Sequence, residues 1–122
     1  MSKKILVAED SSVIQNLTKR ILSIQNYKIT SVKNGKQVLD KIGKEDFDLI
    51  LLDINMPVMD GMECAAKVRE QNKHIPMIAI TGNAKNYSIE DFKNVGINDY
   101  LPKPLDYDAM VEMVKKYVER CS

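Results

Sequence analysis

Acidic residues stand at the ends of two apolar segments, and they are the best placed residues in this chain to do chemistry. Glu9 and Asp10 follow one short apolar run, and Asp53 ends another. Thr81 and Lys103 come directly after two further runs. Such runs are typical of buried strands in a parallel sheet, whose ligands bind outside the carboxyl ends of the strands. We therefore expect these five side chains to meet at one edge of a sheet.

The chemistry that this set of side chains fits is phosphoryl transfer. Glu9, Asp10 and Asp53 would repel one another unless a cation offsets their charge, and Mg²⁺ prefers oxygen ligands of this kind. A carboxylate can also attack phosphorus, while a metal ion and an ammonium group neutralise the phosphoryl oxygens. Lys103 is the candidate ammonium, and Thr81 is a candidate hydrogen-bond donor. Taken singly, each acidic residue is equally explained as a helix cap or a solvated turn residue.

The elements that must position these residues alternate along the chain. Short apolar runs are separated by longer segments in which apolar residues recur every three or four positions, and this alternation predicts a parallel sheet flanked by helices. With right-handed crossovers the result is a three-layer α/β/α sandwich. We expect strands over residues 4–8, 28–32, 47–52, 76–80 and 98–101, and helices over about 11–25, 60–71 and 106–120. A second helix is expected between a turn at Asn34-Gly35 and a stop at Gly43, and a fourth helix of only about two turns between Ser88 and Gly96.

Local signals support several of these boundaries. Asp10 or Ser11 can cap the first helix, and Ser88 with Asp91 resembles a capping box at the start of the fourth. Pro102 cannot donate a hydrogen bond to a neighbouring strand, so the last strand is expected at an edge of the sheet.

The apolar stripes are predicted to be Ile14, Leu17, Ile21 and Ile24 in the first helix, Met62, Ala65, Ala66 and Val68 in the third, and Met110, Val111, Val114, Tyr117 and Val118 in the last.

Composition narrows the function classes. The 122 residues suit one domain, expected over residues 1–122. Because 18 basic residues balance 17 acidic ones, no overall field favours nucleic acid or an anionic membrane. The apolar runs are too short to span a bilayer and no signal-type segment is visible, so a cytoplasmic location is expected. Cys64 and Cys121 match no zinc or redox spacing and are expected to be reduced thiols.

The whole chain resembles a response-regulator receiver domain of two-component and phosphorelay signalling. The resemblance rests on motifs at the strand ends. Val7-Ala8-Glu9-Asp10 resembles the acidic pair of that family, residues 51–61 (LLDINMPVMDG) its phosphoacceptor loop, Ile80-Thr81-Gly82-Asn83-Ala84 its hydroxyl-bearing strand end, and Asp99-Tyr100-Leu101-Pro102-Lys103-Pro104 its lysine segment.

This resemblance implies a site, a fold and a set of partners. Asp53 would be phosphorylated by a histidine kinase or a histidine phosphotransfer protein, with Mg²⁺ held by Glu9, Asp10, Asp53 and the main-chain carbonyl of Asn55. Lys103 and Thr81 would contact the phosphoryl group, and Thr81 and Tyr100 would act as the switch. The implied fold is flavodoxin-like, with strand order 2-1-3-4-5.

The same resemblance implies a signalling phosphoacceptor whose own chemistry is Mg²⁺-dependent self-phosphotransfer and slow autodephosphorylation. The output surface would be formed by the fourth helix, the last strand and the fifth helix, and would bind a downstream protein target. A phosphorylation-dependent dimer is compatible with this scheme. Glu9 stands where many members have aspartate, so its contact with the metal is expected to run through water. A cis bond is expected between Lys103 and Pro104.

Three other functions share some of these features. A phosphatase of the haloacid-dehalogenase type also uses an aspartate with Mg²⁺, but it normally has an acid two residues on, where this chain has Asn55. A flavodoxin-like FMN protein needs a phosphate cradle in the first turn, which is acidic here. A receiver-like domain that is never phosphorylated is disfavoured by the retention of Asp53, Thr81 and Lys103. Length does not decide between a stand-alone regulator and a receiver cut from a hybrid kinase.

Overall fold

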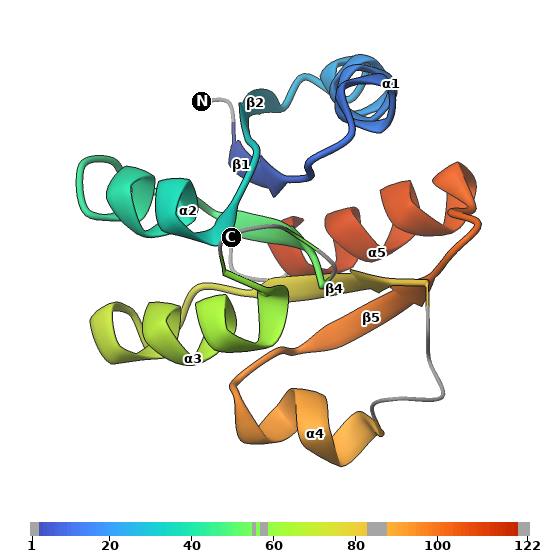
Figure 1. The fold of residues 1–122 in the computed structure, drawn as a ribbon. Coiled ribbons are helices and arrows are strands. Elements are labelled where there is room, and N and C mark those ends of the chain that lie inside the picture. Colours follow the sequence, from blue (N-terminus) through green and yellow to red (C-terminus); the bar gives the residue numbers. More distant parts are fainter. Residues whose placement is uncertain (1–2, 55, 57–58, 83–87, 120–122) are drawn as a thin grey trace.

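The computed structural model describes residues 3–54, 56, 59–82 and 88–119. Five parallel strands lie in the order β2-β1-β3-β4-β5, as expected. Figure 1 shows α1 and α5 on one side of this sheet and α2 and α3 on the other. Along the chain the elements are β1 (Lys4–Ala8), α1 (Ser12–Ser23), β2 (Lys28–Val32), α2 (Gly35–Ile42), β3 (Leu49–Asp53), α3 (Gly61–Gln71), β4 (Met77–Thr81), α4 (Ile89–Asn94), β5 (Asp99–Pro102) and α5 (Tyr107–Glu119).

The core has two halves because successive residues of a strand point to opposite faces of the sheet. In β3, Ile50 and Leu52 pack with α2, α3 and α4. Leu49 and Leu51 pack on the other face with α1 and α5. All five β3 residues are buried. The central strand is therefore a rigid support for the residue that ends it, Asp53.

The helix boundaries follow the predicted local signals. Ser11, rather than Asp10, caps α1 by accepting a hydrogen bond from the Ile14 N–H. The capping box between Ser88 and Asp91 is present at the start of α4. Since Ser11 takes the capping role, the Asp10 carboxylate stays available for another one.

Two predicted apolar stripes were wrong in part. Leu17 of α1 is 41% exposed, and Ile24, which follows the last residue of α1, is 73% exposed, whereas Thr18 and Leu22 are buried. The helix carries more apolar residues than one face can hold, and its packing against the sheet and α5 selects a face rotated from the expected one. In α3, Ala66 is exposed and Cys64 is buried in its place as a free thiol.

The last strand lies at the edge of the sheet, as Pro102 predicted. Pro102 ends β5, which pairs only with β4 among the described residues. The peptide bond between Lys103 and Pro104 is cis, also as expected. In the part of the chain that the structure describes, no helix has both the length and the apolar character needed to cross a membrane.

Candidate functional site

The strand register brings the predicted site residues to one edge. In the parallel sheet, Ala8 pairs with Leu52, and Asp53 lies beside Ile80. Thr81 lies beside Pro102, and the Lys103 N–H donates to the Thr81 carbonyl over 2.9 Å. The residues that follow these strands therefore meet at the carboxyl edge.

Three carboxylates form a compact cluster at this edge. One oxygen from each of Glu9, Asp10 and Asp53 lies within 4.8 Å of the others. Glu9 and Asp53 are buried, whereas Asp10 is exposed. A cluster of negative charge that is buried on one side and open on the other is suited to a hard cation that keeps part of its water shell.

Glu9 is held so that one of its oxygens faces the cluster. Its Oε1 accepts a hydrogen bond of 3.1 Å from the Ser11 N–H. Its Oε2 is buried without a hydrogen-bond partner among the described residues. Burial, followed by the neighbouring Asp53 carboxylate, raises the pKa of Glu9 to about 8. A buried oxygen without a donor is costly, and a bound Mg²⁺ would remove this cost, so the residues present fit that ion.

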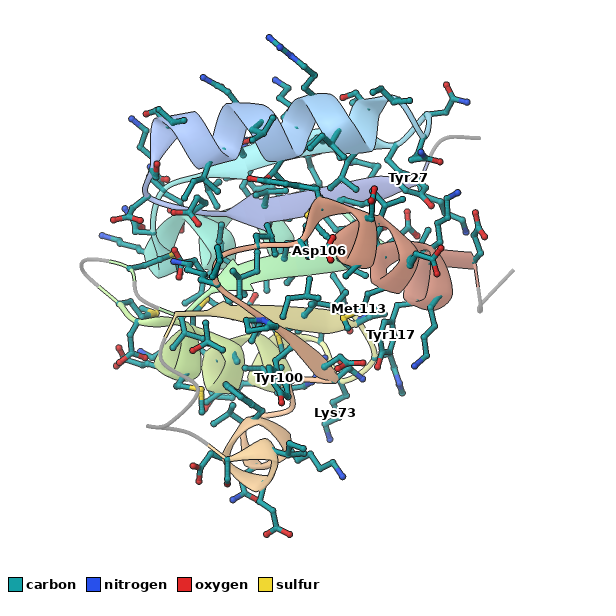
Figure 2. All side chains as sticks on the ribbon, turned by 90° about the vertical axis from the view of Figure 1, so that its right-hand side faces the viewer. Tyr27, Lys73, Tyr100, Asp106, Met113 and Tyr117 are labelled. Atoms are coloured by element: carbon teal, nitrogen blue, oxygen red, sulfur yellow. The ribbon has the colours of Figure 1, made fainter. Side chains whose placement is uncertain are left out.

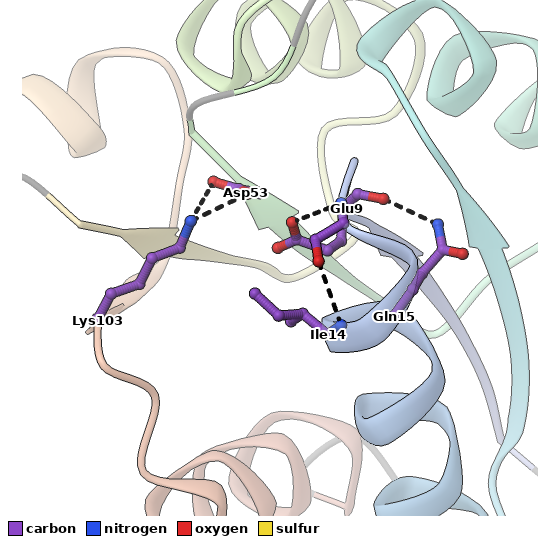
Figure 3. A network of polar contacts seen from close by, with 6 residues as sticks. Glu9, Ile14, Gln15, Asp53 and Lys103 are labelled. Carbon is purple, nitrogen blue, oxygen red and sulfur yellow. Dashed lines mark hydrogen bonds and ion pairs between the residues drawn. The ribbon is translucent and has the colours of Figure 1, made fainter.

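Lys103 is paired with Asp53. Its Nζ lies 3.2 Å from Asp53 Oδ1 and 3.1 Å from Oδ2. Dashed lines mark both contacts in Figure 3. The Asp53 side chain is 1% exposed and that of Lys103 is 30% exposed. The aspartate therefore faces the site and not the apolar core, and the lysine covers it from the solvent side.

Gly82 leaves room for this lysine. A Cβ at this position would lie 3.3 Å from the Lys103 Cδ, which is tighter than ordinary van der Waals contact. The lysine stem thus passes directly over the glycine on its way to Asp53.

The predicted switch residues occupy neighbouring strand ends. Thr81 is buried at the end of β4. Tyr100 is half-buried in β5 and is labelled in Figure 2. Its ring stacks on Phe92 of α4 with 5.5 Å between the ring centroids. Asn55 lies outside the described residues, so its predicted contact with the metal stays a prediction.

Gln15 belongs to the same region, and sequence reasoning missed it. Its Nε2 donates to the carbonyls of Glu9 and Val32, both over 2.8 Å. A glutamine in the first turn of an amphipathic helix is normally a surface residue. Its place six residues after Glu9 was the one signal available, and the nearness of Val32 follows only from the fold.

Comparisons with known proteins agree on one family. The family model described as "Response regulator receiver domain" matches residues 5–115. A receiver domain of the sensor histidine kinase PA1611 from Pseudomonas aeruginosa, solved with a magnesium ion coordinated in its active site cleft, has a TM-score of 0.88 and 30% identity. That similarity covers 98% of this chain and 99% of the other.

Two curated relatives differ greatly in length. Sporulation initiation phosphotransferase F of Bacillus subtilis is 33% identical over 118 residues, which cover 97% of this chain and 95% of the relative. Hybrid signal transduction histidine kinase I of Dictyostelium discoideum is 36% identical over 96% of this chain, which spans only 8% of that kinase. The chain thus matches nearly all of one small relative and a small part of a large kinase.

Proposed function

The chain belongs to the response regulator receiver domain family, and from this premise we propose that it accepts a phosphoryl group on Asp53 in a Mg²⁺-dependent reaction. We propose further that residues 1–122 act as a single receiver domain. Membership of this family sets aside the phosphatase and FMN alternatives. Its relatives include one protein about as short as this chain and a hybrid kinase that is far longer.

One observation carries the proposal. The oxygens of Glu9, Asp10 and Asp53 converge within 4.8 Å, while Lys103 contacts both oxygens of Asp53. A nucleophilic carboxylate beside a cation site and an ammonium group is the arrangement that phosphoryl transfer to a side chain requires. This geometry supports Asp53 as the acceptor over the two other acids.

Glu9, Asp10 and Asp53 would hold Mg²⁺, with the carbonyl of Asn55 as the further ligand. When bound, the ion supplies positive charge that offsets the charge on the transferred phosphoryl oxygens. Glu9 Oε2 is the orphaned oxygen of this set. Because the Ser11 N–H engages Oε1, Glu9 can turn only its second oxygen toward the ion or one of its waters.

In the transfer step, an Asp53 oxygen attacks phosphorus in line with the bond to the donor histidine. The new O–P bond forms as the N–P bond breaks, and the imidazole keeps the electron pair and takes a proton from solvent. Lys103 moves from the carboxylate to a phosphoryl oxygen, and the Thr81 hydroxyl donates to another. Later attack of water on phosphorus breaks the P–O bond to Asp53, which releases inorganic phosphate and returns Asp53 to its free carboxylate.

Burial of Asp53 sets a condition on this step. With 1% of its side chain exposed, the carboxylate cannot be reached by a phosphohistidine until Lys103 releases an oxygen. The lysine is 30% exposed and has a flexible stem, so this release costs no rearrangement of the core. Lys103 thus covers Asp53 before the transfer and contacts the phosphoryl group after it.

A histidine kinase or a histidine phosphotransfer protein is the proposed donor. A surface beside Lys103 supports this. A pocket of about 290 Å³ is lined by Ile14, Lys103 and Leu105 among others, and Val13, which precedes Ile14 in α1, is 76% exposed. A pocket with apolar walls that includes Lys103 suits a protein donor that must dock before it transfers.

Signal output would use the surface of α4, β5 and α5. Movement of Thr81 toward the phosphoryl oxygens would free space for Tyr100, whose ring now stacks on Phe92 of α4. Ile89 at the start of α4 is 56% exposed, which supplies an apolar contact for a downstream protein. Phosphorylation shifts this surface only by as much as the new contacts favour one arrangement over the other.

The proposal is tested by phosphorylation with a small donor. Wild type, Asp53→Asn and Asp40→Asn proteins are incubated with acetyl phosphate, with and without Mg²⁺, and analysed by intact mass and peptide mapping. We expect one hydroxylamine-labile phosphoryl group in wild type and Asp40→Asn with Mg²⁺, and none in Asp53→Asn or in chelator. Equal label in Asp53→Asn would assign the acceptor to another residue.

A further inference from the structure

Gln15 joins three backbone segments next to the acidic cluster. It lies in the first turns of α1, and its single side-chain nitrogen donates to the carbonyls of Glu9 and Val32, each over 2.8 Å. Figure 3 shows the Gln15 amide directed at the Glu9 main chain. Because an amide nitrogen carries two hydrogens, both donors are used in these two bonds.

The carbonyl of Glu9 needs a donor from outside the sheet. β1 ends at Ala8 and β2 at Val32, and the Glu9 N–H makes one bond past the strand ends, to the Val32 carbonyl over 3.0 Å. The backbone hydrogen bonds between β1 and β2 end at this point. Gln15 supplies the donor that the next strand residue would otherwise supply, and so joins the ends of β1 and β2 to α1.

Glu9 is thereby fixed at three points. Its N–H is bound by Val32, its carbonyl by Gln15, and its Oε1 by the Ser11 N–H. The backbone from which the Glu9 and Asp10 side chains project cannot shift without breaking one of these bonds. Metal ligands depend on such support, because outer partners of a metal site typically contribute about 10- to 100-fold to affinity.

We propose that Gln15 is a positioning residue for the metal-binding acids, which it places by holding the Glu9 backbone. This inference rests on the proposed function, since it concerns the same Mg²⁺ site. Glutamine suits the role because methionine has a similar length but no donor, and glutamate would set oxygens against two carbonyls. The side-chain nitrogen of Gln15 donates to main-chain carbonyls and touches no reacting atom.

The test compares two matched glutamine variants. Gln15→Met removes both bonds, while Gln37→Met removes a side-chain bond to the Lys33 N–H in the first turn of another helix. Mg²⁺ affinity is measured with MgCl₂ alone by NMR titration, and unfolding by urea. We expect Gln15→Met to weaken Mg²⁺ binding about tenfold and Gln37→Met to leave it within twofold, although both variants lose stability.

The outcomes separate this inference from its premise. Absence of Mg²⁺ binding by the wild type would overturn both the proposed function and the role of Gln15. Wild-type binding with equal affinity in Gln15→Met, or an equal loss in Gln37→Met, would overturn the positioning role alone.

A measurement on the wild type covers the case in which Gln15→Met does not fold. Both side-chain amide protons of Gln15 should exchange with solvent more slowly than those of the exposed Gln71 and should shift during the Mg²⁺ titration. Fast exchange, or shifts no larger than those of Gln71, would overturn the proposal.

Discussion

Replacing Asp10 by asparagine should stabilise the protein without Mg²⁺ and destabilise it, relative to wild type, with Mg²⁺. Asp10 is exposed and its side chain belongs to a cluster in which the acidic oxygens lie within 4.8 Å. Without a cation, the charges of Asp10 and Asp53 repel each other. Asparagine keeps the shape and removes the charge, so its effect isolates the electrostatic cost of assembling the site.

The size of the stability gain in Asp10→Asn follows from the distance between the acidic oxygens and from the exposure of Asp10. Two unit charges about 4 Å apart interact by about 1 kcal/mol in bulk water and about 4 kcal/mol at an effective dielectric constant near 20. Asp10 is exposed, so the lower figure applies, and at pH 7 Glu9 is largely protonated because its pKa is raised to about 8. We expect a gain of about 1 kcal/mol in chelator, or about 4 °C in Tm for a domain of this size.

Mg²⁺ should reverse the order of stability of wild type and Asp10→Asn. At a concentration 100-fold above its dissociation constant, the ion adds about 2.7 kcal/mol to the free energy of unfolding of wild type. A variant that binds about 100-fold more weakly would gain only about 0.4 kcal/mol under the same conditions. Wild type should then be the more stable protein by about 1 kcal/mol, after the variant's advantage in chelator is subtracted.

The assay is thermal unfolding followed by circular dichroism at pH 7, in EDTA and in MgCl₂. Asp40→Asn is the control, because Asp40 is an exposed carboxylate on α2 and should show the wild-type response to the ion. A Tm of Asp10→Asn below that of wild type in EDTA, or an equal rise in the Tm of both proteins with Mg²⁺, would refute the electrostatic cost assigned to Asp10.

Three further predictions concern the pKa of Glu9, the close packing of Gly61 and the reactivity of the Cys64 thiol. Because the pKa of Glu9 is raised from 4.5 to about 8, the folded protein holds a proton on Glu9 that the unfolded chain releases between these two pH values. The stabilisation from this proton is therefore full below about pH 4.5 and is lost as the pH rises to about 8. Urea midpoints in chelator should fall over that range, and Glu9→Gln should flatten the fall; an unchanged slope would contradict the assignment. Gly61→Ala should cost about 1–3 kcal/mol, because its Cβ would lie 2.7 Å from the Cα of Ile54, the residue that follows Asp53 at the end of β3. Gly43→Ala, whose Cβ meets nothing closer than 3.5 Å, is the control in the same urea titration, and equal losses would count against the clash. Burial raises the pKa of the Cys64 thiol to about 12, so iodoacetamide at pH 8 should modify it only in urea; peptide mapping of the native protein would disprove this by finding Cys64 alkylated.

Much of the fold was readable from local patterns. Continuous apolar runs identified the strands, and short-range chemistry identified several ends: the Ser88–Asp91 capping box is present, and Pro102 ends an edge strand. These features depend on residues close together in the chain, so a sequence pattern contains them. The rotation of α1 was not readable, because its apolar residues fit more than one face until Thr18 and Leu22 pack inward.

The sequence by itself determined which side chains could do the chemistry and that they follow neighbouring strands. Parallel strands end at a common edge, so Glu9, Asp10, Asp53, Thr81 and Lys103 had to be near one another. Only the tertiary structure decided how they meet: Lys103 covers a buried Asp53 from 50 residues away, and Gln15 bridges carbonyls that the chain separates. Those contacts arise because packing brings distant backbone segments within hydrogen-bonding distance, and no local pattern encodes that distance.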